Sequence, residues 1–267
     1  MATPQAEKRD LSPTNQIATI FTTEIGSLLK ARKTAILLGV QFLPVVIAVI
    51  YVFFSDVEGL SMFTETVEGV VFRFLAPLAA LFYGGPALVD EMEGRTLTYL
   101  TLRPVPKPAL FIGKWLAGAT MAIALVVIPI LALLIVAAIA AGGAPGTSAT
   151  TVFQILGATI VGTATYTAIF AALGALFARS LLGGIVYFVV FEMVFAVLPV
   201  FELLSMRFHM RTAADFTAGD RLGALDQFIL DEPLQLDWWM GLGLLGVVCA
   251  GAVLLGAYAF TNKQYHV

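Results

Sequence analysis

Long apolar runs separated by short charged segments follow one another along the chain. A helix needs about 20 apolar residues to cross the roughly 30 Å of hydrocarbon in a bilayer. The run between Lys114 and Arg179 holds 64 uncharged residues, too many for one crossing, and the turn cluster at residues 142–151 divides it into two. Together with the other apolar runs, this pattern predicts six membrane-spanning helices, at residues 34–55, 69–89, 115–141, 151–178, 181–201 and 238–260.

The composition supports a membrane location. Hydrophobic residues make up 59% of the 267 positions, charged residues only 12%, and the mean hydropathy is +0.92. Soluble domains are only about half apolar, so we expect an all-α, polytopic protein of the cell inner (plasma) membrane, in contact with membrane lipids. The net charge of −3 gives no electrostatic support for a nucleic-acid partner.

Lysine and arginine are unevenly distributed over the connecting segments. Cytoplasmic loops of membrane proteins carry an excess of these residues. With both termini in the cytoplasm, eleven of the fifteen basic residues fall inside. The outer loops are acidic instead, both the first one, with Glu65 and Glu68, and the loop 202–237. The pattern therefore predicts that both termini are cytoplasmic, and it leaves four basic residues at or beyond the outer face: Arg73, Arg207, Arg211 and Arg221.

Two segments are expected to lie beside the bilayer. Residues 1–33 precede the transmembrane domain of residues 34–267, and within them Ser12-Pro13 is a helix-start signal. Apolar residues then recur at helical spacing, which is typical of an amphipathic interfacial helix, although the frayed start of the first span is the alternative. The loop 202–237 mixes apolar and charged residues, which fits either a short helical cap or a plain linker. The apolar positions of the first segment are Ile17, Ile20, Phe21, Ile25, Leu28 and Leu29.

A polar island interrupts the apolar runs at residues 89–115. Its acidic residues stand near the start of a short stretch with leucines on one face, where negative charge suits a helix dipole. Pro104, Pro106 and Pro108 forbid continuation of this helix, and Gly113-Lys114 is expected to open the third span at the water boundary. The cytoplasmic loop 90–114 therefore indicates either a docking helix for a cytosolic partner or a solvated loop.

The island also resembles the signature of the ABC-2 family of exporter permeases, and the six-span layout and entry helix match as well. A weaker similarity is the glutamate of the fifth span, Glu192, followed by a Leu-Ser-basic stretch. Arg95 is inserted where the family has an adjacent Gly-Thr pair. The resemblance identifies the following residues as coupling positions: Glu91, Glu93, Gly94, Arg95, Thr96, Leu97, Leu100, Arg103, Pro104 and Lys107.

The resemblance implies a half-transporter. Such permeases pair with a second copy or a paralogue, and each binds a cytosolic ABC ATPase subunit whose ATP hydrolysis drives export. The chain has no GxxxxGK[ST] phosphate loop, so ATP and Mg are expected on that partner and the chain itself is expected to need no cofactor. The resemblance makes the helix near residues 91–103 the coupling element, with the helix of residues 13–33 also touching the ATPase.

Two ionisable residues fall within the expected spans. A charge near the membrane centre costs several kcal/mol, about 2.5 to 3.5 on insertion scales, unless it is paired, protonated or faces water. Glu192 is therefore either a pathway or dimer-interface residue or a buried structural carboxyl bonded to a neighbouring helix. Arg73 is expected to snorkel outward or to pair with Glu65 or Glu68.

Other classes of function have less support. The only histidines, His209 and His266, are not placed to act with Glu91, so the faint likeness of this region to membrane prenyl-protein proteases does not extend to a metal or general-base site. An ATP-independent secondary transporter or a membrane scaffold is the alternative, although no internal repeat supports it. The glycines of the sixth span indicate close helix packing: Gly241, Gly243, Gly246 and Gly251.

Overall fold

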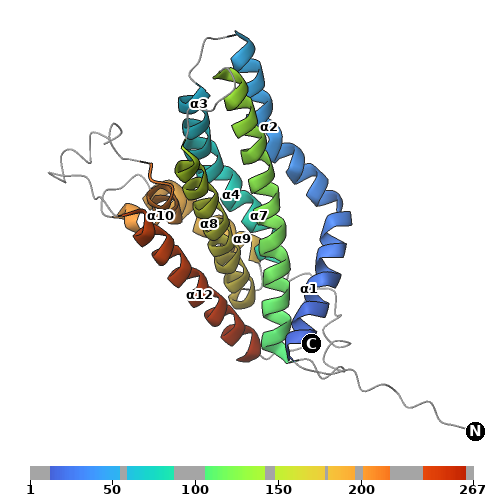
Figure 1. Ribbon diagram of the computed structural model, residues 1–267. Helices are drawn as coiled ribbons and strands as arrows, with labels where there is room; N and C mark the ends of the chain where they lie inside the picture. The colour runs from blue at the N-terminus through green and yellow to red at the C-terminus, as the bar shows by residue number, and fades with distance from the viewer. Residues whose placement is uncertain are drawn as a thin grey trace, which may run out of the picture.

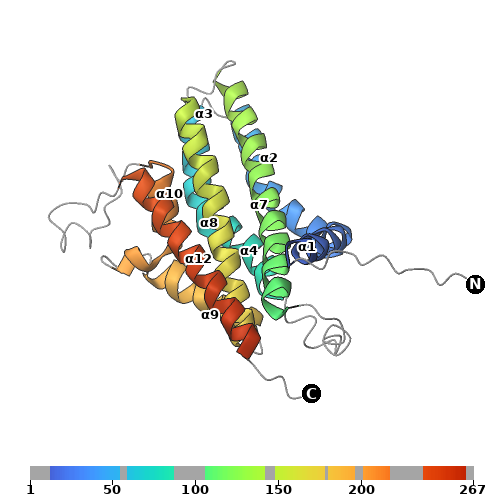
Figure 2. The same ribbon diagram turned by 60° about the horizontal axis from the view of Figure 1, so that its bottom comes forward.

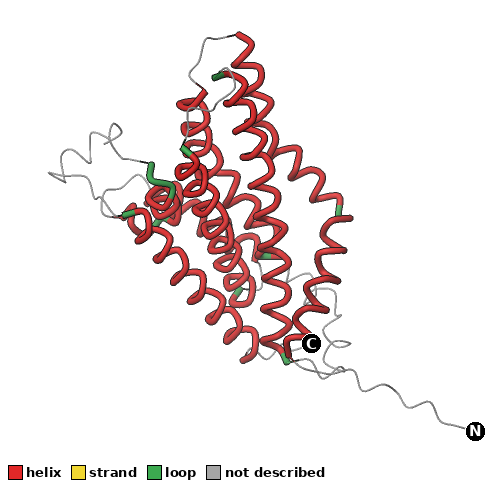
Figure 3. Tube along the Cα trace, viewed as in Figure 1, coloured by secondary structure: helices red, strands yellow, loops and turns green. Residues whose placement is uncertain are grey.

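The chain folds into a bundle of helices in a computed structural model, which describes residues 13–54, 59–86, 106–141, 148–177, 180–195, 201–216 and 237–262. Every regular element in these ranges is helical (Figure 3). In chain order they are α1 Pro13–Lys30, α2 Arg32–Phe54, α3 Gly59–Thr66, the π-helix η1 Val67–Leu75, α4 Ala76–Gly84, α7 Lys107–Ala140, α8 Ala149–Leu176, α9 Ser180–Tyr187, the π-helix η2 Phe188–Val194, the 3₁₀ turn η4 Phe201–Leu204, α10 Met206–Ala213 and α12 Trp238–Asn262.

Five helical stretches within the described ranges are long and apolar enough to cross a membrane. They are Arg32–Phe54, Ser61–Gly84, Lys107–Ala140, Ala149–Leu176 and Trp238–Asn262. The expected fifth span, 181–201, is described as a shorter apolar helix, Leu181–Val194. The protein is thus an all-helical, multi-pass membrane protein with five to six apolar helices able to span.

Two of the observed spans, the second and the third, start earlier in the chain than expected. Helical structure leading into the second span begins at Gly59, ten residues before the expected start, so Glu65 and Glu68 belong to the helix rather than to the loop before it. The third span begins at Lys107 instead of residue 115, with Pro108 in its first turn. Proline is well suited to this position, because the first backbone N–H groups of a helix have no partner within the helix. Pro108 therefore lies at the beginning of a helix.

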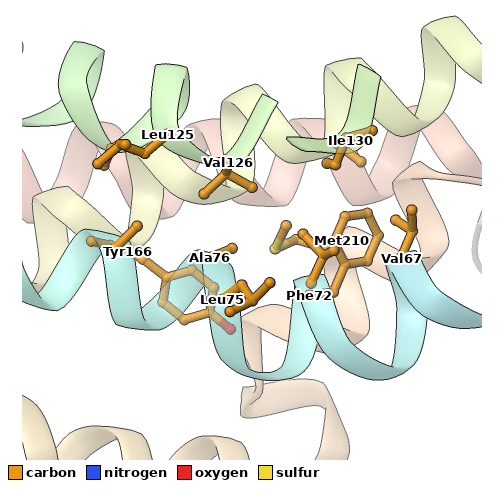
Figure 4. Close-up of a cluster of buried hydrophobic side chains, with 14 of the residues drawn as sticks. Val67, Phe72, Leu75, Ala76, Leu125, Val126, Ile130, Tyr166 and Met210 are labelled. Carbon is orange, nitrogen blue, oxygen red and sulfur yellow. The ribbon is translucent and has the colours of Figure 1, made fainter. Parts of the chain in front are cut away.

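The helices α7 and α8 form the middle of the bundle. The first packs against α1, α2, α3, α4, α8 and α12, and the second also contacts α9 and α10. Their facing residues, together with η1, α4 and α10, form the main buried cluster, which Figure 4 shows in close-up. Residues labelled there are Val67, Phe72, Leu75, Ala76, Leu125, Val126, Ile130, Tyr166 and Met210. In contrast, α2 and α12 leave broad apolar faces exposed.

Two glycines let α4 fit closely between the central helices. A Cβ at Gly118 of α7 would lie 2.7 Å from the backbone oxygen of Tyr83, and a Cβ at Gly84 would lie 2.6 Å from that of Thr167 in α8. Side chains at either position would push the backbones apart, because such contacts are far inside van der Waals distance. The end of α4 is therefore fixed between α7 and α8.

The helix α1 is separate from the first span. Ala31 interrupts the helical structure between α1 and α2, and α1 turns aside from α2 in both views of the ribbon (Figures 1 and 2). It packs against the first turns of α7, so the amphipathic helix expected before the first span is present as a distinct element. Of its apolar positions, Leu28 is buried and Leu29 is exposed. Figure 1 shows α1, the start of α7 and the end of α12 at the same end of the bundle.

Candidate functional site

Most of the polar island, residues 89–105, lies outside the described residues. This holds for nine of the ten expected coupling residues, namely Glu91, Glu93, Gly94, Arg95, Thr96, Leu97, Leu100, Arg103 and Pro104. Their coupling role stays a prediction. What the structure describes are the two flanks of the segment, the end of α4 on one side and the start of α7 on the other.

The flank on α4 is bonded to the junction between α1 and α2 around Ala31, which we call the elbow. The hydroxyl oxygens of Tyr83 and Thr34 lie 2.7 Å apart. Thr34 gives its own proton to the carbonyl oxygen of Leu28 at 2.6 Å, so the phenol of Tyr83 is the donor to Thr34. The ammonium group of Lys33 also lies 5.6 Å from the centre of the Tyr83 ring. Tyr83 thus links the last turn of α4 to α2, and through Thr34 to the end of α1.

The flank on α7 is bonded to α1. The ammonium group of Lys114 lies 3.9 Å from a carboxylate oxygen of Glu24. A Cβ at Gly113 would lie 2.9 Å from a methyl carbon of Ile20, which shows how closely the two helices approach. Lys114 was expected at the water boundary as the opening residue of the third span, but it lies in the second turn of α7 and is buried beneath α1.

Lys107 is the one expected coupling residue within the described ranges. It is the first residue of α7, and its ammonium group donates to the backbone oxygen of Thr261 at 3.3 Å. The last carbonyls of a helix have no partner in that helix, and a lysine is well suited to satisfy one of them. Lys107 therefore ties the start of α7 to the end of α12.

Glu192 is buried away from this end of the bundle and is fully engaged. Its carboxylate accepts hydrogen bonds from the hydroxyl of Ser205 at 2.6 Å and from the backbone N–H groups of Met206 at 2.9 Å and Arg207 at 3.3 Å. All three donors belong to the start of α10. These contacts explain how the carboxylate is accommodated, while a role in the pathway or at a dimer interface stays a prediction.

A second set of charges lies between η1 and α10. Arg211 pairs with Glu68 at 2.8 Å and with Glu202 at 3.2 Å. Glu68 was one of the two expected partners of Arg73; the guanidinium of Arg73 lies 5.5 Å from the centre of the Phe74 ring. The resemblance named the Leu-Ser-basic stretch that contains Ser205 together with Glu192, but the sequence did not indicate Arg211, because nothing in the spacing of the loop 202–237 relates it to the spans.

The charged groups of α10 are affected by their surroundings. Burial lowers the pKa of Arg207, and the positive charges of Arg211 and Arg73 lower it further. Arginine nevertheless remains protonated at any physiological pH. Burial also lowers the pKa of His209, although its bond to the backbone oxygen of Leu203 at 2.9 Å acts in the opposite direction. His209 is therefore a neutral donor to that oxygen.

The fold and these sites describe a multi-pass helical membrane protein with a separate entry helix. The chain matches the family model described as ABC-2 family transporter protein over residues 22–198, about two thirds of its length. It therefore belongs to the ABC-2 family, whose members are the membrane-spanning components of ABC-type transporters and are not themselves catalytic. No curated protein sequence matches the chain.

Proposed function

We propose that this permease exports its substrate and is driven by a separate cytosolic ABC ATPase that docks at the polar island. The observation that carries the proposal is that the flanks of the undescribed segment 87–105 are bonded to the first two helices, one flank to α2 and the other to α1. Tyr83 bonds Thr34 on one side, and Lys114 pairs with Glu24 on the other. We further propose that this end of the bundle is cytoplasmic.

The contacts give a route for movement from the island to the spans. A displacement of residues 87–105 acts on α4 and α7, because α4 precedes this segment in the chain and α7 follows it. The close packing at Gly84 and Gly118 passes a shift of α4 to both central helices, and Lys107 passes a shift of α7 to the end of α12. Closure of an ATPase dimer on two islands then shifts the population of inward- and outward-facing states.

The proposal includes a second permease copy or a paralogue, with ATP and Mg bound by the ATPase alone. The exposed apolar faces of α2 and α12 are available to lipid and to such a partner. Light scattering of the purified particle in detergent measures its mass. A particle with two copies of the 28.5 kDa chain supports the pairing, and a strictly single copy alongside an ATPase contradicts it.

The docking site is tested by co-purification from native membranes. An affinity-tagged chain is expected to retain an ATPase with a phosphate loop, identified by mass spectrometry. Replacement of residues 94–103 by a Gly-Ser linker of equal length is expected to abolish its retention. The matched control replaces residues 221–230 of the loop 202–237 by the same linker and should keep the ATPase.

Three outcomes count against the proposal. If the 94–103 replacement retains the ATPase, the island is not the docking site. If both linker variants lose the ATPase, its retention does not depend specifically on the island. If the intact chain retains no ATPase although it is correctly inserted, the ATP-independent transporter or scaffold becomes the better interpretation.

A further inference from the structure

The helix α10 is too short to hold its position alone. It has eight residues, whereas isolated helices shorter than about 12 to 15 residues are marginal in water. Its buried positions are Met206, His209, Met210 and Ala213, which form a single face at helical spacing. This face packs on α8, α12 and η1. Neighbouring elements must therefore set where α10 lies.

The N-terminus of α10 is held by a carboxylate from another helix. Ser205 is the N-cap residue, but its side chain makes no cap bond; its hydroxyl donates to Glu192 instead. Glu192 itself accepts the first N–H groups of α10, those of Met206 and Arg207. These groups have no partner within the helix, and a negative charge is favourable at this end of the helix dipole. Glu192 thus acts as the cap of α10 although it lies 14 residues before Met206.

The C-terminus of α10 is held by a second carboxylate. Arg211 lies in its last turn, where positive charge suits the dipole. Its guanidinium forms an ion pair with Glu68 of η1 and also pairs with Glu202, which precedes α10 in the chain. The two ends of α10 are therefore held by carboxylates from two different spans, Glu192 at its N-terminus and Glu68 at its C-terminus.

Both anchors belong to π-helical segments. Glu192 lies in η2 and Glu68 in η1, and at their ends the N–H of Phe195 donates to Val190 and that of Ala76 to Val71, five residues back in each case. Such segments are rare in proteins and are frequently found at functional sites. A π-helical turn holds about one residue more than an α-helical turn, so rewinding such a segment at constant length turns the residues beyond it by about 100°, the angle between successive residues of an α-helix. Rewinding would thus move each carboxylate off its donors.

We propose that Glu192 and Glu68 are positioning residues which hold α10 at its two ends, so that rewinding of either π-helical segment releases this helix from α8. The helix α10 lies at the opposite end of α12 from Lys107. A Cβ at Gly241, near the start of α12, would lie 2.8 Å from the backbone oxygen of His209. Release of α10 is therefore a change at the end of the bundle away from the polar island.

A buried cysteine on α10 reports its release. Met210 has no exposed surface and faces Gly162 of α8. A Cβ added at Gly162 would lie 2.5 Å from the Met210 side chain. The reporter is Met210→Cys in a chain whose only native cysteine is removed by Cys249→Ser. The rate of reaction with N-ethylmaleimide is followed by mass spectrometry on the full chain in detergent. This measurement needs neither an ATPase nor a substrate, so its result is independent of the proposed function.

Glu192→Gln is expected to speed the labelling about tenfold, because a neutral amide replaces a carboxylate that accepts three hydrogen bonds. Glu68→Gln is expected to accelerate the labelling less, about threefold, because the ion pair between Arg211 and Glu202 remains. The matched control is Glu24→Gln, which makes the same change at an ion pair on α1 and should leave the rate unchanged. Unchanged labelling in Glu192→Gln, or equal acceleration in Glu24→Gln, would overturn the proposal.

Two further variants complete the test. If Glu192→Gln does not fold, Ser205→Ala removes one of the three bonds and should still speed labelling about twofold to threefold; no change in this variant would also overturn the positioning role. Deletion of Val189, an exposed residue of η2, lets this segment wind as an α-helix while Glu192 keeps nearly its present direction. Labelling should therefore be no faster than in the unaltered chain, as in Val189→Ala. Labelling as fast as in Glu192→Gln, with helix content retained, contradicts release by rotation of the carboxylate.

Discussion

Tyr83 of α4 donates a hydrogen bond to Thr34 of α2 across 2.7 Å, although 49 residues separate them in the chain. This bond joins the last turn before the polar island to the elbow that carries α1. Because Tyr83 is buried, water does not replace the bond when it is lost.

Tyr83→Phe is expected to lower the stability of the folded state by about 0.5 to 1.5 kcal/mol, the usual worth of one hydrogen bond. The ring and its packing stay, so the change isolates the hydroxyl. The measurement is the midpoint of thermal unfolding in detergent. Tyr258→Phe is the matched control, because Tyr258 is exposed on α12. Equal shifts in the two variants would show that the bond to Thr34 contributes nothing.

Gly118→Ala is expected to destabilise the bundle by about 1 to 3 kcal/mol, the typical cost of overpacking. The added Cβ meets the backbone oxygen of Tyr83, which cannot move aside as a flexible side chain would. Gly39→Ala in α2 is the control: it has nothing within 4 Å of the added carbon and gains helix propensity worth up to about 1 kcal/mol. Thermal unfolding of both variants decides the matter, and a Gly118→Ala protein as stable as Gly39→Ala contradicts the close approach.

Thr165→Val is expected to weaken the contact between α8 and α12 only slightly. The hydroxyl of Thr165 bonds the backbone oxygen of Leu245 at 3.0 Å and also that of Val161 at 2.8 Å in its own helix. Hydrogen bonds between membrane helices average about 0.6 kcal/mol, and valine keeps the shape of threonine. The free energy of unfolding, measured by denaturant in mixed micelles, should fall by about this amount. A loss several times larger would point to a role for the hydroxyl beyond this contact.

His209 makes the stability of the protein depend on pH. Its pKa in the folded state lies below the ordinary value of 6.5, so the unfolded chain binds more protons between the two values. Stability from this group is therefore present above about pH 6.5 and is lost as the pH falls toward the folded pKa. Between about pH 7.5 and about pH 5.5, the unfolding midpoint of the unaltered chain should fall more than that of His209→Gln. His266 is common to both proteins and cancels; identical pH profiles would contradict the burial effect.

The apolar runs predicted most of the helices because charge is so costly in a bilayer that its positions mark the ends of spans. The boundaries were less accurate where charges are buried in protein. Lys114 indicated a water boundary, but α1 covers it and Glu24 pairs with it. Glu68 indicated a loop, but Arg211 pairs with it inside helical structure. A single sequence shows the charge and conceals the partner.

The glycines of α12 illustrate the same limit. Gly241 does meet α10 closely, as the expected packing role requires, whereas Gly243, Gly246 and Gly251 have nothing within 4 Å among the described residues. Their pattern in the sequence is the same, and only the position of α10 distinguishes them. The anchoring of α10 by Glu192 was predicted only in part for a related reason: the sequence offered a bond to a neighbouring helix and a Leu-Ser-basic stretch after Glu192, but no spacing showed that Ser205 and Met206 are the partners.

In the proposed coupling to an ATPase, the length of α7 bears on where force enters the membrane domain. At about 1.5 Å per residue its 34 residues extend about 51 Å, whereas the hydrocarbon layer is only about 30 Å thick. If it stands upright in the bilayer, the same continuous helix extends some 20 Å beyond the hydrocarbon, and α1 lies against its first turns. A helix that extends beyond the bilayer can be pushed at its outer end. A small sideways push on its protruding head tilts the part inside the bilayer without breaking any bond along the helix.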